Sequence, residues 1–93
     1  MKVKKANYGN YSSNNYGANS IRLDVGSLSL WFSYDTVVAF QEDGNSCQVS
    51  ENCWGPTTGK HLNWIESDKK ARLSRDVFEH NLERVLATHN LIV

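Results

Sequence analysis

The sequence has few cysteines, a single proline, no long apolar run and no excess of either charge. No apolar stretch approaches the about 18 residues that a membrane span needs, and the first residues lead into Asn, Tyr and Ser instead of an export signal. Without such a signal the protein is expected in the cytoplasm, where Cys47 and Cys53 stay reduced thiols. A net charge of zero argues against non-specific binding to nucleic acid.

The composition is sufficient for a folded core. Ninety-three residues with 40% hydrophobic content and three tryptophans are typical of one domain, residues 1–93. The charges are nevertheless segregated along the chain. Residues 1–22 carry bases without acids, residues 23–59 carry acids without bases, and residues 60–75 carry mostly bases. Two basic segments that met on one surface would form a local positive patch.

Alternating apolar and polar residues predict a β-hairpin in the first half of the chain. Gly26-Ser27 suits the two-residue turn between its strands. A turn at that point pairs apolar residues on one face, namely Val25 with Leu28, Leu23 with Leu30 and Ile21 with Phe32. Trp31 falls on the opposite face, where it either covers a second layer or is exposed for binding.

A second hairpin is predicted around Asp43-Gly44, which is a strong type I′ turn signal. That turn pairs Phe40 with Cys47 and Val38 with Val49. In one straight strand Cys47 and Cys53 lie too far apart to bridge, so both are interpreted as small hydrophobic residues. Residues 2–5 are expected to form a lysine-protected edge strand, and residues 71–73 a short fifth strand.

A helix is predicted after Ser74, which suits the N-cap position, with Leu73 packing against Phe78. Its apolar stripe comprises Phe78, Leu82, Val85, Leu86 and His89. The predicted fold is therefore α+β, an antiparallel β-meander of four to five strands with one C-terminal helix packed on one face. Its expected core comprises Leu23, Leu30, Phe32, Phe40, Val49, Phe78 and Leu82.

The segment ENCWGPTTGKHLNW, residues 51–64, is the first candidate binding site. Gly55, Pro56 and Gly59 are expected to hold residues 57–61 as a surface loop. Trp54 would offer an apolar platform, and Trp64 is expected to be the more buried tryptophan. The remaining candidate binding residues, which would supply donors to a partner or an anion, are Thr57, Thr58, Lys60 and His61.

The tyrosine-rich segment KANYGNYSSNNYGAN, residues 5–19, is the second candidate. Asn-Tyr-Gly occurs at Asn7 and again at Asn15, within a turn-rich composition. Tyr8, Tyr11 and Tyr16 either stack on bases or dock on a partner, or their rings cover the edge of the sheet.

Residue patterns that would support catalysis are incomplete. Gly55 to His61 lacks the spacing of a phosphate-binding loop, and His61 stands where a magnesium-binding Ser or Thr belongs. Cys53 and His61 are the residue types of a thiol hydrolase site, but their spacing in the sequence does not support such a site. The Cys and His residues also lack the closely spaced pairs that bind zinc. We therefore expect no catalytic residues, no metal and no cofactor.

Three blocks, NYGNYSSNNYGA, WFSYDTVVAF and ENCWGPTTGKHLNWI, resemble a family of small uncharacterised proteins of bacteriophages and prophages. The resemblance runs from Val3 to about Phe78. It implies a small phage accessory protein in the cytoplasm of the infected host. By analogy with such proteins, the expected function is a non-enzymatic binding module that occupies a host protein, for instance as an anti-defence inhibitor. The alternative is a single-stranded nucleic-acid-binding protein that uses the lysine-rich segments and the tyrosines.

Overall fold

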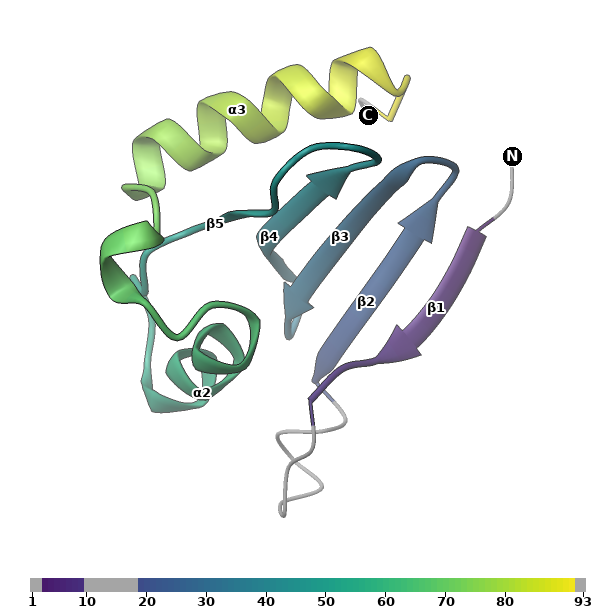
Figure 1. The fold of residues 1–93 in the computed structure, drawn as a ribbon. Coiled ribbons are helices and arrows are strands. Elements are labelled where there is room, and N and C mark those ends of the chain that lie inside the picture. The colour runs from purple at the N-terminus through teal and green to yellow at the C-terminus, as the bar shows by residue number, and fades with distance from the viewer. Residues whose placement is uncertain (1–2, 10–18, 92–93) are drawn as a thin grey trace.

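The computed structural model describes residues 3–9 and 19–91. In chain order the elements are β1 (Val3–Asn7), β2 (Ser20–Val25), β3 (Leu28–Ser33), β4 (Thr36–Glu42), β5 (Gln48–Val49), α2 (Pro56–Ile65), the 3₁₀-helix η1 (Lys69–Ala71) and α3 (Arg75–Thr88). The strands form one five-stranded antiparallel sheet in sequence order (Figure 1). The α+β meander is confirmed, but α2 is present in addition to the expected C-terminal helix. No helix within the described ranges is both long and apolar enough to cross a membrane.

The β2–β3 hairpin has the register that the sequence predicts. Val25 lies opposite Leu28, and Leu23 lies opposite Leu30. Gly26 adopts a φ of +60° in the turn, a conformation that glycine tolerates because it has no Cβ. The turn chemistry and the apolar alternation therefore agree on one pairing, as expected.

The β4–β5 pairing is shifted by one residue from the predicted register. Ala39 lies opposite Val49 and Phe40 opposite Gln48, so the expected pairs of Phe40 with Cys47 and of Val38 with Val49 are wrong. A turn forms at the predicted position, since the Asn45 amide donates to the Glu42 carbonyl at 3.0 Å. It is not of type I′, because Gly44 has a positive φ of +85° and Asp43 does not. The two residues that follow, 46 and 47, then lie outside the strand and change the register.

A β-bulge in β4 accounts for an additional buried side chain. Trp31 pairs with Ala39 and Phe32 pairs with Val37, which leaves Val38 without an opposite residue. A bulge bends its strand and re-aims side chains. Val38 and Ala39 are consequently neighbours in sequence and both fully buried in the same cluster.

The two ends of the sheet differ. β1 is the outermost strand on one side, and all five of its residues are exposed, as expected for a lysine-bearing edge. At the other side the predicted strand at residues 71–73 is wrong, because Ala71 is the last residue of η1 and Arg72 is its C-cap. Leu73 instead forms an isolated parallel bridge with Ser50, in which its amide donates to the Val49 carbonyl at 2.8 Å.

Helix α3 packs on one face of the sheet through the predicted stripe. Ser74 is its N-cap, and the Phe78 ring is fully buried 5.5 Å from the Phe40 ring. This cluster contains Leu28, Leu30, Phe40, Phe78 and Val85, with Leu23, Phe32 and Leu82 among the residues packed against it. The expected core thus lies in this cluster except for Val49, which lies in the second cluster, and Leu23, Phe32 and Leu82 are partly buried.

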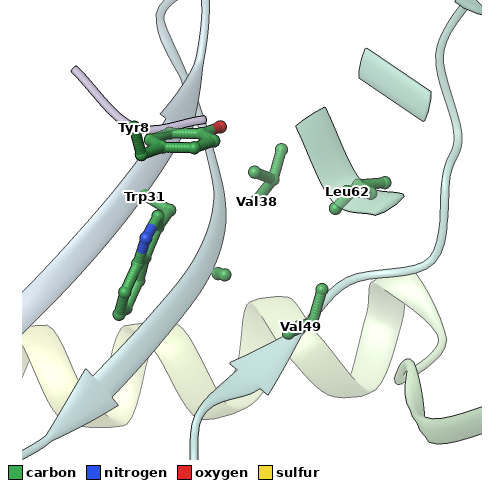
Figure 2. Close-up of a cluster of buried hydrophobic side chains, with 6 residues drawn as sticks. Tyr8, Trp31, Val38, Val49 and Leu62 are labelled. Atoms are coloured by element: carbon green, nitrogen blue, oxygen red, sulfur yellow. The ribbon is translucent and has the colours of Figure 1, made fainter. Parts of the chain in front are cut away.

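The second cluster lies on the opposite face, because successive side chains of a strand point to opposite sides. It contains Tyr8, Trp31, Val38, Ala39, Val49 and Leu62, and Figure 2 shows Tyr8 and Trp31 on one side of Val38 and Leu62 of α2 on the other. Of the two interpretations of Trp31, burial under a second layer is therefore confirmed, and exposure for binding is not. One C-terminal helix could not have covered both faces, which is why α2 is needed.

Cys47 and Cys53 are free, in agreement with prediction, but both are exposed. The interpretation of these cysteines as small buried hydrophobic residues is therefore wrong. The physical reason is the length of β5, which contains only Gln48 and Val49, so neither cysteine belongs to a strand.

Candidate functional site

The segment expected to be a surface loop, residues 57–61, is the first half of helix α2. Pro56 opens the helix, where its fixed φ suits the first turn and its missing N–H leaves no bond unmade. Thr58, His61 and Leu62 are buried at helical spacing. The loop prediction failed because two of these inward residues are polar, so apolar periodicity does not reveal the helix.

Contacts at its middle and at its end hold α2 in place. A Cβ on Gly59 would lie 3.1 Å from Nδ2 of Asn52, so glycine allows the preceding segment to approach the helix closely. At the C-terminal end Arg72 donates to the Glu66 carbonyl at 2.8 Å and to Oδ1 of Asn63 at 2.7 Å. A cationic donor at this end also complements the helix dipole.

A buried polar cluster joins α2 to the end of β3. Ser33 Oγ lies 2.9 Å from Oγ1 of Thr58 and 2.7 Å from Nδ1 of His61. The His61 ring is fully buried, and the Tyr8 ring lies edge-on to it with centroids 5.9 Å apart. Each polar atom of the cluster thus has a partner inside the protein, which avoids the cost of burying it unpaired.

A pocket of about 390 Å³ opens beside this cluster. Its walls are residues 33–36 and Val38 from the β3–β4 hairpin, and residues 54–58 from the start of α2. Two exposed aromatic rings stand among them, Tyr34 and Trp54. We call this site the Tyr34–Trp54 pocket.

The β3–β4 turn places Tyr34 at the pocket through an unusual backbone conformation. Tyr34 has a φ of +59°, which is uncommon for a residue with a side chain. Its amide donates to the Asn19 carbonyl at 2.9 Å, and its side chain is 43% exposed. A bulky residue held in a strained turn at the surface is an arrangement often found at functional sites.

Trp54 is held in position by a residue of helix α3. The Arg75 guanidinium lies 4.8 Å from the centroid of the Trp54 ring, in cation–π geometry. Arg75 also donates to Oε1 of Glu79 at 2.8 Å and to the Val37 carbonyl at 3.1 Å. These bonds orient the guanidinium and, through it, the indole that forms a wall of the pocket.

The structure brings together some of the predicted binding residues and separates others. Trp54, Thr57 and Thr58 line the pocket. Lys60 is exposed on α2 and does not line it, and His61 lies beneath the surface instead of offering a donor to a partner.

The predicted aromatic residues also have different positions from those expected. Tyr8 is buried in the second cluster, and its hydroxyl donates to the Phe32 carbonyl at 2.7 Å, so it is not displayed to a partner. Tyr11 and Tyr16 lie outside the described residues. Trp64 is 54% exposed and Trp54 38%, so the expectation that Trp64 is the more buried of the two is wrong.

Sequence reasoning missed Tyr34 and Asp35 as pocket residues. The available signal was the junction of two alternating strands, where a hairpin needs two residues for its turn. Tyrosine is not a typical turn residue, so the residue types at that junction do not indicate a turn.

The other chemical patterns are dispersed. Cys53 Sγ lies 3.6 Å from Oε1 of Glu51, whereas His61 contacts Ser33. Burial, together with the charge and hydrogen bond of Glu51, raises the Cys53 pKa, which leaves a weaker nucleophile at neutral pH. Residues 3–9 and 19–91 contain no cluster of three or more His, Cys, Asp or Glu side chains that could hold a metal ion.

Fold and site together define a small α+β protein in which an aromatic-walled pocket adjoins a buried Ser–Thr–His cluster. The model of a family of unknown function (DUF8033) matches residues 1–80, and the chain belongs to that family. The resemblance to an uncharacterised family is thereby confirmed, and the phage origin stays a prediction. The comparison with curated proteins and the comparison with solved structures each gave no match.

Proposed function

We propose that the chain is a non-enzymatic binding module that holds a protein partner at the Tyr34–Trp54 pocket. The observation that carries the proposal is the exposure of two aromatic rings, 43% for Tyr34 and 38% for Trp54, on the walls of one pocket. Aromatic side chains next to a pocket are typical of the energetic centres of protein interfaces. Covering these rings would remove apolar surface from water at little cost in side-chain entropy.

The pair formed by Ser33 and His61 supports a structural role better than a catalytic one. Ser33 is 3% exposed and His61 is fully buried. The Ser33 hydroxyl is already shared between Thr58 and His61. A nucleophile and its base must reach a substrate, whereas Ser33 lines the pocket with almost no exposed surface and His61 does not line it.

The distribution of lysines favours a protein partner over single-stranded nucleic acid. Lys4 and Lys5 lie on β1, and Lys69 and Lys70 lie on η1, beyond the opposite side of the sheet (Figure 1). A nucleic-acid site needs such charges on one continuous surface to follow the phosphates. In the described residues these two groups do not converge.

The biological setting is proposed from the sequence blocks. The resemblance of NYGNYSSNNYGA and WGPTTGKHLNW to phage and prophage proteins supports a small phage-type accessory protein acting in the host cytoplasm. Its partner is then a host protein, and the module acts by occupying that protein, for instance as an inhibitor of a defence component.

The test compares two exposed tryptophans. Tagged wild type, Trp54→Ala and Trp64→Ala are used to capture proteins from host lysate with and without nuclease. The partner should be retained by wild type and Trp64→Ala and lost by Trp54→Ala, with nuclease having no effect. Thermal melting establishes that each variant is folded.

Equal retention by Trp54→Ala and wild type would contradict the proposed site. Release by nuclease, together with an affinity for labelled single strands that falls steeply between 50 and 200 mM salt, would favour the nucleic-acid alternative.

A further inference from the structure

The Tyr34–Trp54 pocket contains a carboxylate that the fold does not use. Asp35 follows Tyr34 in the β3–β4 turn, is exposed and lines the pocket. No hydrogen bond or ion pair joins its side chain to any residue in 3–9 or 19–91. The pocket therefore presents a carboxylate that is available to a ligand.

The pocket walls add a second feature that attracts cations. The faces of tyrosine and tryptophan rings carry negative electrostatic potential and bind ammonium and guanidinium groups within about 6 Å. The protein itself already demonstrates this at Trp54, where the Arg75 guanidinium lies 4.8 Å from the ring centroid. A carboxylate that lines the same pocket as two such rings is complementary to a cation.

From these observations we propose that the pocket accepts a cationic side chain, lysine or arginine, of the protein partner. This inference rests on the proposed function and specifies the chemistry of the bound group. The volume of about 390 Å³ lies near the lower end of the range for ligand pockets, about 300–1000 Å³, so one inserted side chain suits it better than an extended segment.

Two positive features near the pocket oppose a cation, and each is reduced by its surroundings. The N-terminus of α2 carries about half a unit of positive charge, and Pro56 supplies no N–H to its first turn. The Arg75 charge is paired with Glu79 at 2.8 Å. An anionic guest would also have to approach the unpaired carboxylate of Asp35.

The test is a titration with small probes, in which binding is monitored through the NMR signals of the Trp54 indole N–H and the Tyr34 ring. The cationic probes are N-acetyl-lysine methylamide and N-acetyl-arginine methylamide. The matched neutral probe carries an acetyl group on the lysine Nζ, and the anionic probe is N-acetyl-glutamate methylamide. Assignment of the indole signal comes from Trp54→Phe.

Both cationic probes should shift the two signals, with dissociation constants on the order of 10 mM, since each is a small fragment. The neutral and anionic probes should bind at least about threefold more weakly. Asp35→Asn should weaken the binding of the cationic probes by a similar factor. Asp35→Glu should retain the preference for cationic probes because it keeps the carboxylate. Thermal melting of both variants shows that the turn is intact.

Equal or tighter binding of the neutral or anionic probe would overturn the inference, as would a preference unchanged in Asp35→Asn. Absence of any shift at 50 mM probe would overturn it as well. The proposed function is judged separately, by loss of the captured partner in Trp54→Ala and its retention in Trp64→Ala. A partner lost in Trp54→Ala but held equally by Asp35→Asn would leave the binding module in place and remove its charge preference.

Discussion

Ser33 Oγ lies 2.7 Å from Nδ1 of His61, and this buried contact connects the last residue of β3 to the middle of α2. The same hydroxyl lies 2.9 Å from Oγ1 of Thr58, one turn earlier in the helix. Because Ser33 directly precedes Tyr34, the cluster fixes the position of α2 relative to the turn that forms the pocket wall. The shape of the pocket thus depends on hydrogen bonds among buried polar side chains.

The first prediction concerns His61. Replacement by alanine removes a fully buried ring and leaves the Ser33 hydroxyl with one partner fewer. His61→Ala should lower the free energy of unfolding by about 2–4 kcal/mol. Lys60→Ala, at the exposed neighbouring position, should change it by no more than about 0.5 kcal/mol. Urea denaturation of the three proteins measures both effects, and equal midpoints would show that the buried cluster does not hold α2.

The second prediction concerns the contact between α3 and the sheet. Phe78 is fully buried against Phe40, whereas the adjacent Val77 is 49% exposed. Phe78→Ala should cost about 3–5 kcal/mol, a large part of the stability of a small domain. Val77→Ala should be nearly neutral. A cooperative Phe78→Ala transition at the wild-type midpoint would mean that the helix does not dock in this way.

The third prediction separates stability from binding at Tyr34. Glycine relieves the strain of a φ of +59° but increases the entropy of the unfolded chain. Tyr34→Gly should therefore stay within about 1 kcal/mol of wild type, and should melt higher than Asp35→Gly, where no positive φ is relieved. Binding of the partner should be lost in Tyr34→Gly. A large loss of stability, with binding retained by the folded fraction, would assign Tyr34 a structural role.

The fourth prediction concerns thiol reactivity and its dependence on pH. Desolvation by burial raises the pKa of the Cys47 thiol to about 11, and the charge of Glu66 contributes, although the residue as a whole is exposed. A raised pKa lowers the thiolate fraction at pH 8 about 100-fold, which the greater nucleophilicity of that thiolate partly offsets. Alkylation of Cys47 by iodoacetamide should be about tenfold slower in the folded protein than in urea.

Mass spectrometry of Cys53→Ser protein, which retains Cys47 alone, follows this alkylation. In the folded protein the alkylation rate should continue to rise with pH up to about 11, where the Cys47 thiol is half ionised. In urea the rate should level off once the pH exceeds the ordinary cysteine pKa of about 8.5. Equal rates for folded and unfolded protein at pH 8 would contradict the prediction.

The first hairpin and helix α3 could be predicted from the sequence because several local signals agree there. Gly26 suits the turn, the alternation around Leu23 and Leu30 sets the register, and Ser74 marks the helix start. Each signal acts over a few residues, so no distant contact was needed to interpret it. The same agreement explains why most of the core under α3 was predicted.

Helix α2 and the pocket could not be predicted in this way. The inward positions of α2 include Thr58 and His61, which apolar periodicity treats as surface. They are buried because Ser33, 25 and 28 residues earlier in the chain, lies opposite them. Tyr34 likewise has a partner distant in sequence, because its amide donates to the Asn19 carbonyl.

The parallel bridge between Ser50 and Leu73 has a consequence for how the molecule can change over evolution. The chain leaves the sheet after Val49 and returns to it at Leu73, whose carbonyl accepts from the Glu51 amide at 2.7 Å. Residues 52–72, including α2 and one wall of the pocket, therefore form an excursion whose two ends are adjacent. Substitutions and length changes within it can alter what the pocket accepts, while the sheet and α3 keep their own core.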